Sequence, residues 1–482
     1  MTRMRTSSTT KRAGIIGIAQ AASYIATQVV TLVLVNWLTP ADFGIFALCQ
    51  VIVNLAVTVS TFGLEEAAIQ SKGDPEDNIT TAANLRLIIA SIATFLVFIS
   101  AQWLANLMGS PEAGMPLGVL SISFIISTLA FTPRVWIRKD LQFGKIAVAT
   151  MAKAAIWATV ALILAFLNFQ YWALVFAFLA GALGNALVIY VLRPMRPKFR
   201  LNLSKVKPLL TFGAHTTGTG LLVFLSQNLD KIAIGMMVGM GGLGVYWIAY
   251  QYGTIPATFL TAVATTVLFP EYVILSRNVD DLRNKHNSVL RHLAILIYPI
   301  GIGMAAISPT FVTELFGTAW LSAIIPLSIL SVFSILYSFN STSGIIFIST
   351  SNSRQMLKQN VVMFIPFIVL LVPSIILFGM IGAALLFVGI QLVQFIWVTV
   401  SVGRILNYSI VRQLRQVHLI PAVSSLLMGL VIVAVWTVFG TTLYSLLIQM
   451  AVGIGVYTLI LMVLTKGKII RDLKHIWVAV LH

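Results

Sequence analysis

The sequence predicts an all-α polytopic membrane protein with about fourteen transmembrane helices. Hydrophobic residues make up 59% of the 482-residue chain, and charged residues only 9%. A soluble protein of this length could not bury so much apolar surface. The lysines and arginines also gather in clusters, which are separated by long stretches that hold almost none. A β-barrel would instead show short segments of alternating hydrophobicity, which the sequence lacks.

Each of these stretches has the length of two transmembrane helices. The shortest covers 45 residues, and one helix of that length would extend about 68 Å, roughly twice the thickness of the hydrocarbon core. Each stretch is therefore expected to cross the membrane and return, so that both ends lie on the same basic side. The stretches are 13–71, 87–133, 146–192, 208–276, 292–353, 359–403 and 416–465.

Short outer turns divide these hairpins into the expected spans. Because the positive-inside rule retains Lys and Arg in the cytoplasm, the basic loops and both termini are expected on the cytoplasmic side. The outer turns, none of which contains Lys or Arg, are expected at 38–42, 105–114, 167–171, 238–242, 316–320, 378–382 and 439–442. The spans are expected at 14–37, 41–62, 80–104, 114–133, 146–167, 170–192, 209–238, 242–269, 292–315, 320–349, 359–378, 381–403, 416–438 and 442–464.

A basic linker after the sixth span predicts two lobes of six helices around a central cavity. The segment LTPADFGIFALCQ at 38–50 is echoed by VGMGGLGVYWIAY at 238–250, an offset that places Gly44 on Gly244 and Phe46 on Tyr246. Such an echo fits two parallel repeats. The expected parts are an N-terminal lobe at 1–192, the linker at 193–208, a C-terminal lobe at 209–408, two further helices at 409–465 and a basic cytoplasmic tail at 466–482.

Composition and motifs exclude several classes of protein. The net charge of +17 follows from the positive-inside rule and does not indicate a nucleic-acid partner. The six histidines are scattered, Cys49 is the one cysteine, and no phosphate-binding loop is present. No metal, cofactor or disulfide is therefore expected, and an enzyme is disfavoured because no paired carboxylates occur within the spans. The basic N-terminus is expected to be an uncleaved cytoplasmic segment.

Four charged residues lie deep within the expected spans, away from the outer turns, where ionised groups are costly and usually face a cavity or a partner. These residues are Arg86, Lys153, Asp230 and Lys231. Arg86 and Lys153 could instead extend to the inner interface. Lys231 lies in the outer half of its span, where a cavity role competes with a structural pair. Asp230 is the adjacent residue, so the two side chains point about 100° apart.

Polar side chains also form stripes on the first and seventh spans. In the seventh span, His215, Thr219, Gln227 and Lys231 fall on one face at multiples of four residues. In the first span, Gln20 and Gln28 belong to a similar stripe with neighbouring hydroxyl residues. Both stripes predict helices that line a wet central cleft. Hydrogen bonds between packed helices are the alternative explanation.

Segments spread over the chain resemble the bacterial polysaccharide transporter family, the repeat-unit flippases of the multidrug/oligosaccharidyl-lipid/polysaccharide exporter superfamily. The segments are LTPADFGIFAL, FGLEEAAIQ, NLDKIAIGMMVGMGGLGVYWIAYQY, VLFPEY and ELFGTAWLSA. The resemblance implies alternating access in the bacterial inner membrane, with a polyprenyl-diphosphate-linked oligosaccharide as substrate. Membrane lipids and the polysaccharide polymerase machinery are the other implied partners.

The resemblance gives the intramembrane charges a role. Arg86 and Lys153 would meet the anionic diphosphate from the inside, and Lys231 would receive it towards the outside. Asp230 would release it from Lys231 or bind a coupling cation. The amides of Gln20, Gln28 and Gln227 and the hydroxyl groups would contact the sugars.

Two other transporters remain open at this point, together with a scaffold that transports nothing. A cation-coupled multidrug antiporter should have an acidic cavity, whereas bases outnumber acids among the intramembrane charges. A lipid-linked peptidoglycan-precursor flippase carries a cargo of similar chemistry, and the sequence separates it poorly. A scaffold would have no use for the polar stripes.

Overall fold

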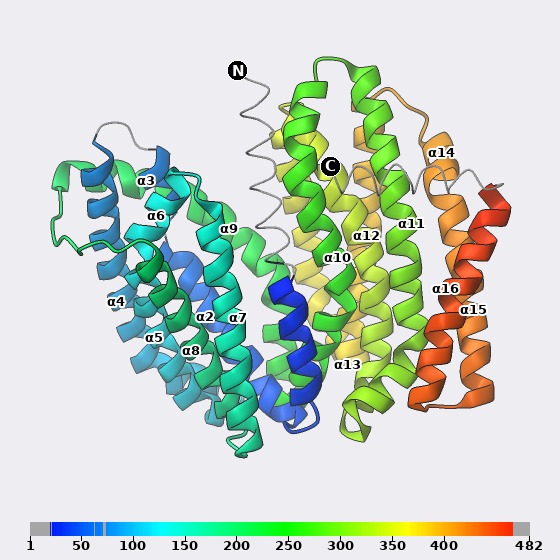
Figure 1. Cartoon of the computed structure of the whole chain (residues 1–482), viewed down its shortest axis with the longest axis horizontal. Coiled ribbons are helices and arrows are strands. Elements are labelled where there is room, and N and C mark those ends of the chain that lie inside the picture. The colour runs from blue at the N-terminus through cyan, green and yellow to red at the C-terminus, as the bar shows by residue number, and fades with distance from the viewer. Residues whose placement is uncertain (1–19, 21, 62, 71–73, 466–482) are drawn as a thin grey trace. The chain divides into compact units, whose positions relative to one another are not determined.

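The computed structural model describes residues 20, 22–61, 63–70 and 74–465, so the basic N-terminus and the tail lie outside the described residues. All regular elements within this part of the chain are helices (Figure 1), which confirms the expected all-α fold. The chain divides into two compact units, unit 1 at Met1–Trp247 and unit 2 at Ile248–His482. The lobe boundaries expected from the sequence stay a prediction.

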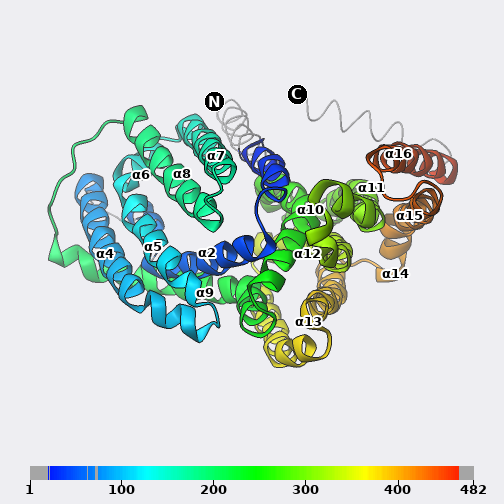
Figure 2. The same cartoon turned by 90° about the horizontal axis from the view of Figure 1, so that it is seen from below.

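Unit 1 is built around α2. This helix contacts α4, α5, α8 and α9, as Figure 2 shows from below. Its residues are apolar on nearly every side, which is the pattern of a helix surrounded by other helices. The elements of unit 1 are the helix Ala22–Leu34, α2 (Pro40–Thr61), α3 (Leu64–Gln70), α4 (Pro75–Leu107), η1 (Pro111–Ala113), α5 (Gly114–Leu129), α6 (Phe131–Lys139), α7 (Phe143–Phe166), α8 (Tyr171–Leu192), α9 (Leu203–Val238) and the first turns of α10 (Met240–Leu275).

Unit 2 contains the rest of α10 and the helices that follow it. The long helix α13 is two helices joined at Gly379, whose φ of +57° turns the chain at an expected outer turn. Glycine adopts this backbone region without steric cost. The later elements are α11 (Val279–Phe311), η2 (Val312–Phe316), η3 (Thr318–Ala323), α12 (Ile324–Ser349), α13 (Ser353–Ile405), α14 (Ile410–Gln413), η4 (Leu414–Leu419), α15 (Ile420–Phe439) and α16 (Leu443–Thr465).

The helices account for the spans expected from the sequence. Within the described residues, 11 helices are long and apolar enough to cross a membrane. The shorter helix Ala22–Leu34, the helix α10 and the second limb of α13 account for the remaining expected spans. The chain is therefore a multi-pass membrane protein.

The first turns of α2 and α10 cross in direct backbone contact. A Cβ atom at Gly44 would lie 1.8 Å from the carbonyl oxygen of Met240, and one at Gly244 would lie 1.8 Å from that of Pro40. Only glycine fits at either position, because both obstacles are backbone atoms that cannot rotate away. The crossing therefore joins the two positions that the sequence echo aligns.

Asp42 links two of the expected outer turns. Its Oδ2 accepts hydrogen bonds from the backbone N–H of Thr39 at 2.9 Å and from the Thr39 hydroxyl at 2.6 Å. Its Oδ1 accepts a third, at 3.0 Å, from the N–H of Tyr171. The turns before α2 and before α8 therefore lie on the same side of unit 1, as the hairpin pattern predicts.

The last two helices of unit 2 pack against α11 (Figure 1). Gln449 on α16 donates to the Thr310 hydroxyl at 2.9 Å, and the Tyr457 hydroxyl donates to the carbonyl of Ile295 at 2.7 Å. These buried polar contacts fix α16 along the length of α11, because each satisfies a group that has no water partner in an apolar interior.

Several basic segments that the sequence predicts as inner loops are helical. The segment after the fourth span forms α6, and the segment after the eighth span forms the first turns of α11. At 33 residues, α4 and α11 would each extend about 50 Å, which exceeds the hydrocarbon core. The charged first turns of these helices are therefore expected to project beyond the hydrocarbon.

Candidate functional site

Two cations from different helices lie together in unit 1. Lys153 on α7 and Arg134 on α6 are close enough to interact electrostatically. Arg134 donates from Nη2 to Oδ1 of Asn185 on α8 at 2.7 Å, and Asn185 donates from Nδ2 to the Ala149 carbonyl at 3.0 Å. Ala149 lies one turn before Lys153, so Asn185 positions Arg134 beside the same part of α7.

Lys153 is exposed on unit 1. Its Nζ lies 5.8 Å from the centre of the Phe178 ring, which attracts a cation through its quadrupole. No ion pair or hydrogen bond of this amine occurs among the described residues. Two neighbouring cations, one with an available amine, form a local positive potential that favours an anionic ligand.

Arg86 is packed within unit 1, with 6% of its surface exposed. Its Nη2 donates to the hydroxyl of Ser127 at 3.3 Å, and its guanidinium lies 5.0 Å from the centre of the Phe131 ring. Glu65 on α3 interacts electrostatically with both Arg86 and Arg134 and forms an ion pair of 3.1 Å with Arg138. Glu65 therefore faces this group of arginines, and the adjacent Glu66 also interacts electrostatically with Arg86.

Asp230 and Lys231 form a buried polar group on α9. The Asp230 side chain is fully buried, and its Oδ1 lies 3.6 Å from Nζ of Lys231. The hydroxyl of Tyr246, on α10, donates to the other carboxylate oxygen at 2.8 Å. Lys231 also donates to the carbonyl of Gln227, one turn earlier, at 2.6 Å. The two adjacent side chains therefore come within ion-pair distance despite their angular separation.

The structure describes part of the polar stripes expected on the first and seventh spans. Gln20 and Gln227 are exposed, whereas Gln28 is buried. The side chains of His215 and Thr219 lie outside the described residues. Several hydroxyl and amide groups of both helices bond to the carbonyl one turn earlier: Thr27, Thr31, Ser226 and Asn228. Their contribution to a wet cleft stays a prediction.

Sequence reasoning missed Arg134 and Asn185. The distribution of Lys and Arg places Arg134 in the basic loop after the fourth span, whereas it belongs to α6 and turns towards α8. Asn185 carried a usable signal, because an amide within an otherwise apolar span needs a polar partner. Which partner it finds could not be predicted, since helical periodicity gives no distance between helices. Within the described residues, no three His, Cys, Asp or Glu side chains group as metal ligands.

The family described as "Polysaccharide biosynthesis protein" matches residues 33–325, which is more than half of the chain. The chain belongs to this polysaccharide biosynthesis family. The resemblance noted in the sequence is thereby confirmed, and the matched range covers α2 to α9, including Lys153, Arg134 and Asp230.

Curated relatives in polysaccharide biosynthesis resemble the chain over different lengths. The lipopolysaccharide biosynthesis protein WzxC of Escherichia coli is 27% identical over 86% of this chain and 81% of its own. The teichuronic acid biosynthesis protein TuaB of Bacillus subtilis is 26% identical over 58% of this chain and 59% of its own. The succinoglycan biosynthesis transport protein ExoT of Rhizobium meliloti is 23% identical over 60% and 58%.

Solved structures of transporters share the fold of this family member. The lipid II flippase MurJ, in an inward closed conformation, matches with a TM-score of 0.74 over 94% of this chain and 99% of its own, at 16% identity. An inward-facing multidrug resistance transporter of the MATE family matches with a TM-score of 0.63 over 82% and 99%, also at 16% identity. At these identities the likeness concerns the fold alone.

Proposed function

We propose that this protein is a flippase for polyprenyl-diphosphate-linked oligosaccharide repeat units. It moves them from the inner to the outer leaflet of the bacterial inner membrane by alternating access, for surface or exopolysaccharide biosynthesis. Membership of the polysaccharide biosynthesis family supports the pathway, and the similarity to ExoT, a succinoglycan biosynthesis transport protein, supports transport. The fold shared with a lipid-linked precursor flippase supports the mode of action.

The observation that carries the proposal is the Lys153–Arg134 pair. A diphosphate is an anion that accepts several hydrogen bonds, and Arg and Lys are the side chains that bind it best. Lys153 is an exposed residue whose amine forms no ion pair or hydrogen bond among the described residues, and Asn185 orients the guanidinium of Arg134 beside the same part of α7. Arg86 would add positive charge behind them, balanced by Glu65.

The remaining expected roles complete the proposal. The cargo would pass through a cavity between lobes at 1–192 and 209–408, where the polar side chains of the first and seventh spans meet the sugars. Lys231 would take the diphosphate in the outer half, and Asp230 would release it or bind a coupling cation. Both termini would lie in the cytoplasm, and the polymerase would receive the product. The chain would move its cargo without chemical change.

The first experiment is to delete the gene, extract the membrane lipids and complement the strain with variants. We expect a polyprenyl-diphosphate oligosaccharide to accumulate on the cytoplasmic side and surface polysaccharide to be lost. Lys153→Arg should restore export, whereas Lys153→Gln should not, because it loses a charge-assisted contact. Such a contact contributes about 1.5–3 kcal/mol, or roughly 10- to 100-fold in affinity.

The outcomes separate the function from the site. No accumulation, together with raised sensitivity to cationic drugs, would contradict the flippase and favour the antiporter. If the lipid accumulates in the deletion strain and Lys153→Gln relieves it as fully as the unmodified protein, the flippase function stands. Lys153 then has no role in that function.

A lipid-linked peptidoglycan-precursor flippase is the second candidate, because the chain shares its fold with the lipid II flippase. The two cargoes carry similar diphosphate headgroups, so the cation pair serves either. The chemical identity of the lipid that accumulates in the deletion strain distinguishes them.

A further inference from the structure

The linker between α8 and α9 turns an apolar strip away from the protein. Phe199, Leu201 and Leu203 alternate with polar residues and are 82%, 39% and 76% exposed. The alternate residues Lys198 and Asn202 reach back to carboxylates of α4. Lys198 and Asn202 thus turn towards α4, whereas Phe199, Leu201 and Leu203 face away from it.

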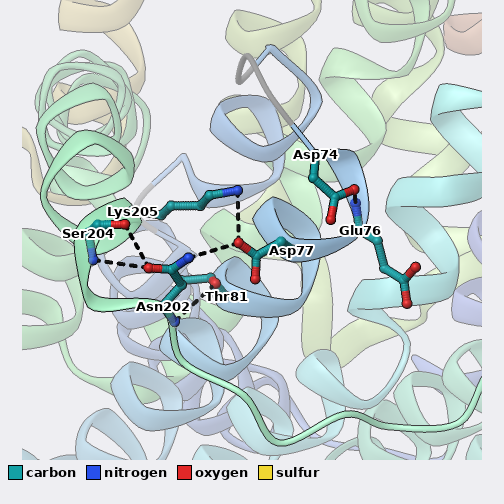
Figure 3. Close-up of polar contacts among 7 residues, drawn as sticks. All are labelled: Asp74, Glu76, Asp77, Thr81, Asn202, Ser204 and Lys205. Carbon is teal, nitrogen blue, oxygen red and sulfur yellow. Dashed lines mark hydrogen bonds and ion pairs between the residues drawn. The ribbon is translucent and has the colours of Figure 1, made fainter.

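This orientation is held by specific contacts with the first turns of α4. The side chain of Asn84 donates to the carbonyls of Lys198 and Arg200 at 2.8 and 2.9 Å. Figure 3 shows how Asn202 donates to Asp77 at 2.9 Å while its own Oδ1 caps the start of α9. Lys205 pairs with the same carboxylate at 2.9 Å. The backbone is thus pinned, so the outward strip is a built feature of unit 1.

The start of the linker contacts aromatic side chains of α6 and α8 that are typical of a membrane–water interface. The ring of Trp136 has Lys139 and Arg193 each at 5.5 Å from its centre, and the Tyr190 hydroxyl donates to the carbonyl of Met195. Tryptophan and tyrosine gather at headgroup level, where one side of the ring is apolar and the other is wet. The linker leaves α8 at this level.

Exposed cations flank the strip, and one of them, Arg200, also interacts electrostatically with Asp77. Arg196, Arg200 and Lys207 are exposed, and none forms an ion pair with a carboxylate among the described residues. The carboxylates of this region are engaged with other partners: Glu76 with Lys198, and Asp77 with Lys205 and Asn202. The outward surface therefore combines apolar side chains with unpaired cations.

We propose that residues 196–207 form a docking surface for acidic phospholipids of the cytoplasmic leaflet. Phe199, Leu201 and Leu203 enter the boundary between headgroups and acyl chains, while Arg196, Arg200 and Lys207 bind the lipid phosphates. Basic side chains near such a surface are attracted by its negative potential. The complementary charges favour lipid over a protein partner. This surface is independent of the transported cargo.

A fluorescent label on the strip tests the proposal in the full chain. Cys49 is the one native cysteine, so Cys49→Ala provides a background for Phe199→Cys labelled with an environment-sensitive nitrobenzoxadiazole dye. The labelled protein is placed in vesicles of phosphatidylcholine with phosphatidylglycerol and in vesicles of phosphatidylcholine alone. We expect blue-shifted emission, quenched by spin-labelled lipid, in the acidic vesicles, and a smaller shift in 1 M salt, where the screening length falls to about 3 Å.

A charge-neutralised variant is the matched control. Arg196→Gln, Arg200→Gln and Lys207→Gln together remove the unpaired cations while leaving the pinning contacts of Asn84 and Asp77 in place. The blue shift in acidic vesicles should then fall to that in neutral vesicles. Equal emission from the two vesicle types, with Arg196, Arg200 and Lys207 in place, would overturn the proposal. A water-like label in both would show that the strip does not enter lipid, and a protein partner would then be the alternative occupant.

Discussion

At the residue scale, the buried Asp230–Lys231 pair changes how the seventh span should be tested. The sequence suggests that Lys231 could be replaced by Gln without harm to the fold. The structure places it 5% exposed and 3.6 Å from a carboxylate that is fully buried. Removing one partner of such a pair leaves the other charge without compensation, which usually destabilises a protein by about 3–5 kcal/mol.

Lys231→Gln is therefore expected to lower the thermal unfolding temperature of the purified protein in detergent. The double variant Asp230→Asn with Lys231→Gln removes both charges and should recover much of that loss. Melting monitored by size-exclusion fluorescence gives the stabilities, and export in the complemented strain gives the function. Full export by the folded double variant would show that the pair serves structure and not transport.

The charged residues within the spans show how much of the candidate site could be predicted from the sequence. Arg86, Lys153, Asp230 and Lys231 stand out because charge is costly inside a bilayer, and this needs no knowledge of neighbours. Their partners could not be predicted. Arg134 meets Asn185 from another hairpin, and the helix-to-helix geometry that joins them depends on packing over the whole unit.

At the element scale, the hairpins follow from the distribution of Lys and Arg, because the cost of moving these charges across lipid acts locally. The ends of the helices are predicted less accurately from this distribution. The start of α9 at Leu203 precedes the expected span, because Asn202 caps it and Asp77 holds its first turn. Such contacts extend a helix beyond the hydrocarbon, where the apolar pattern no longer marks it.

The crossing of α2 and α10 predicts a sharp difference between two glycines. Gly44→Ala places a methyl group against the Met240 carbonyl and should destabilise the protein by about 1–3 kcal/mol or more. Gly241→Ala is the matched control, since a Cβ there has no atom within 4 Å, and it should be neutral or slightly stabilising. Thermal melts of both variants provide the measurement. Equal melting temperatures would contradict the close crossing.

At the scale of the whole molecule, the pattern of seven hairpins with basic inner loops predicts the side of the membrane on which every connection lies. Fusions of alkaline phosphatase, which is active only outside the cytoplasm, should be active after Gly440, in the turn between α15 and α16. Fusions after Leu406, between α13 and α14, should be inactive. Green fluorescent protein should give the opposite pattern at the same positions. Activity of the phosphatase at both sites would contradict the expected topology.

The crossing at Gly44 and Gly244 has a consequence for the local symmetry of unit 1. The sequence echo aligns Gly244 with Gly44, and therefore aligns Met240 with Pro40. Gly44 contacts Met240, and Pro40 contacts Gly244, so the same two aligned positions meet in both directions. In a two-fold interface, a residue of one copy contacts a second residue of the other copy, and the same contact occurs with the copies exchanged. The crossing therefore gives the first turns of α2 and α10 a local two-fold relation within one polypeptide, so that a substitution at either glycine is expected to disturb both helices at the same point.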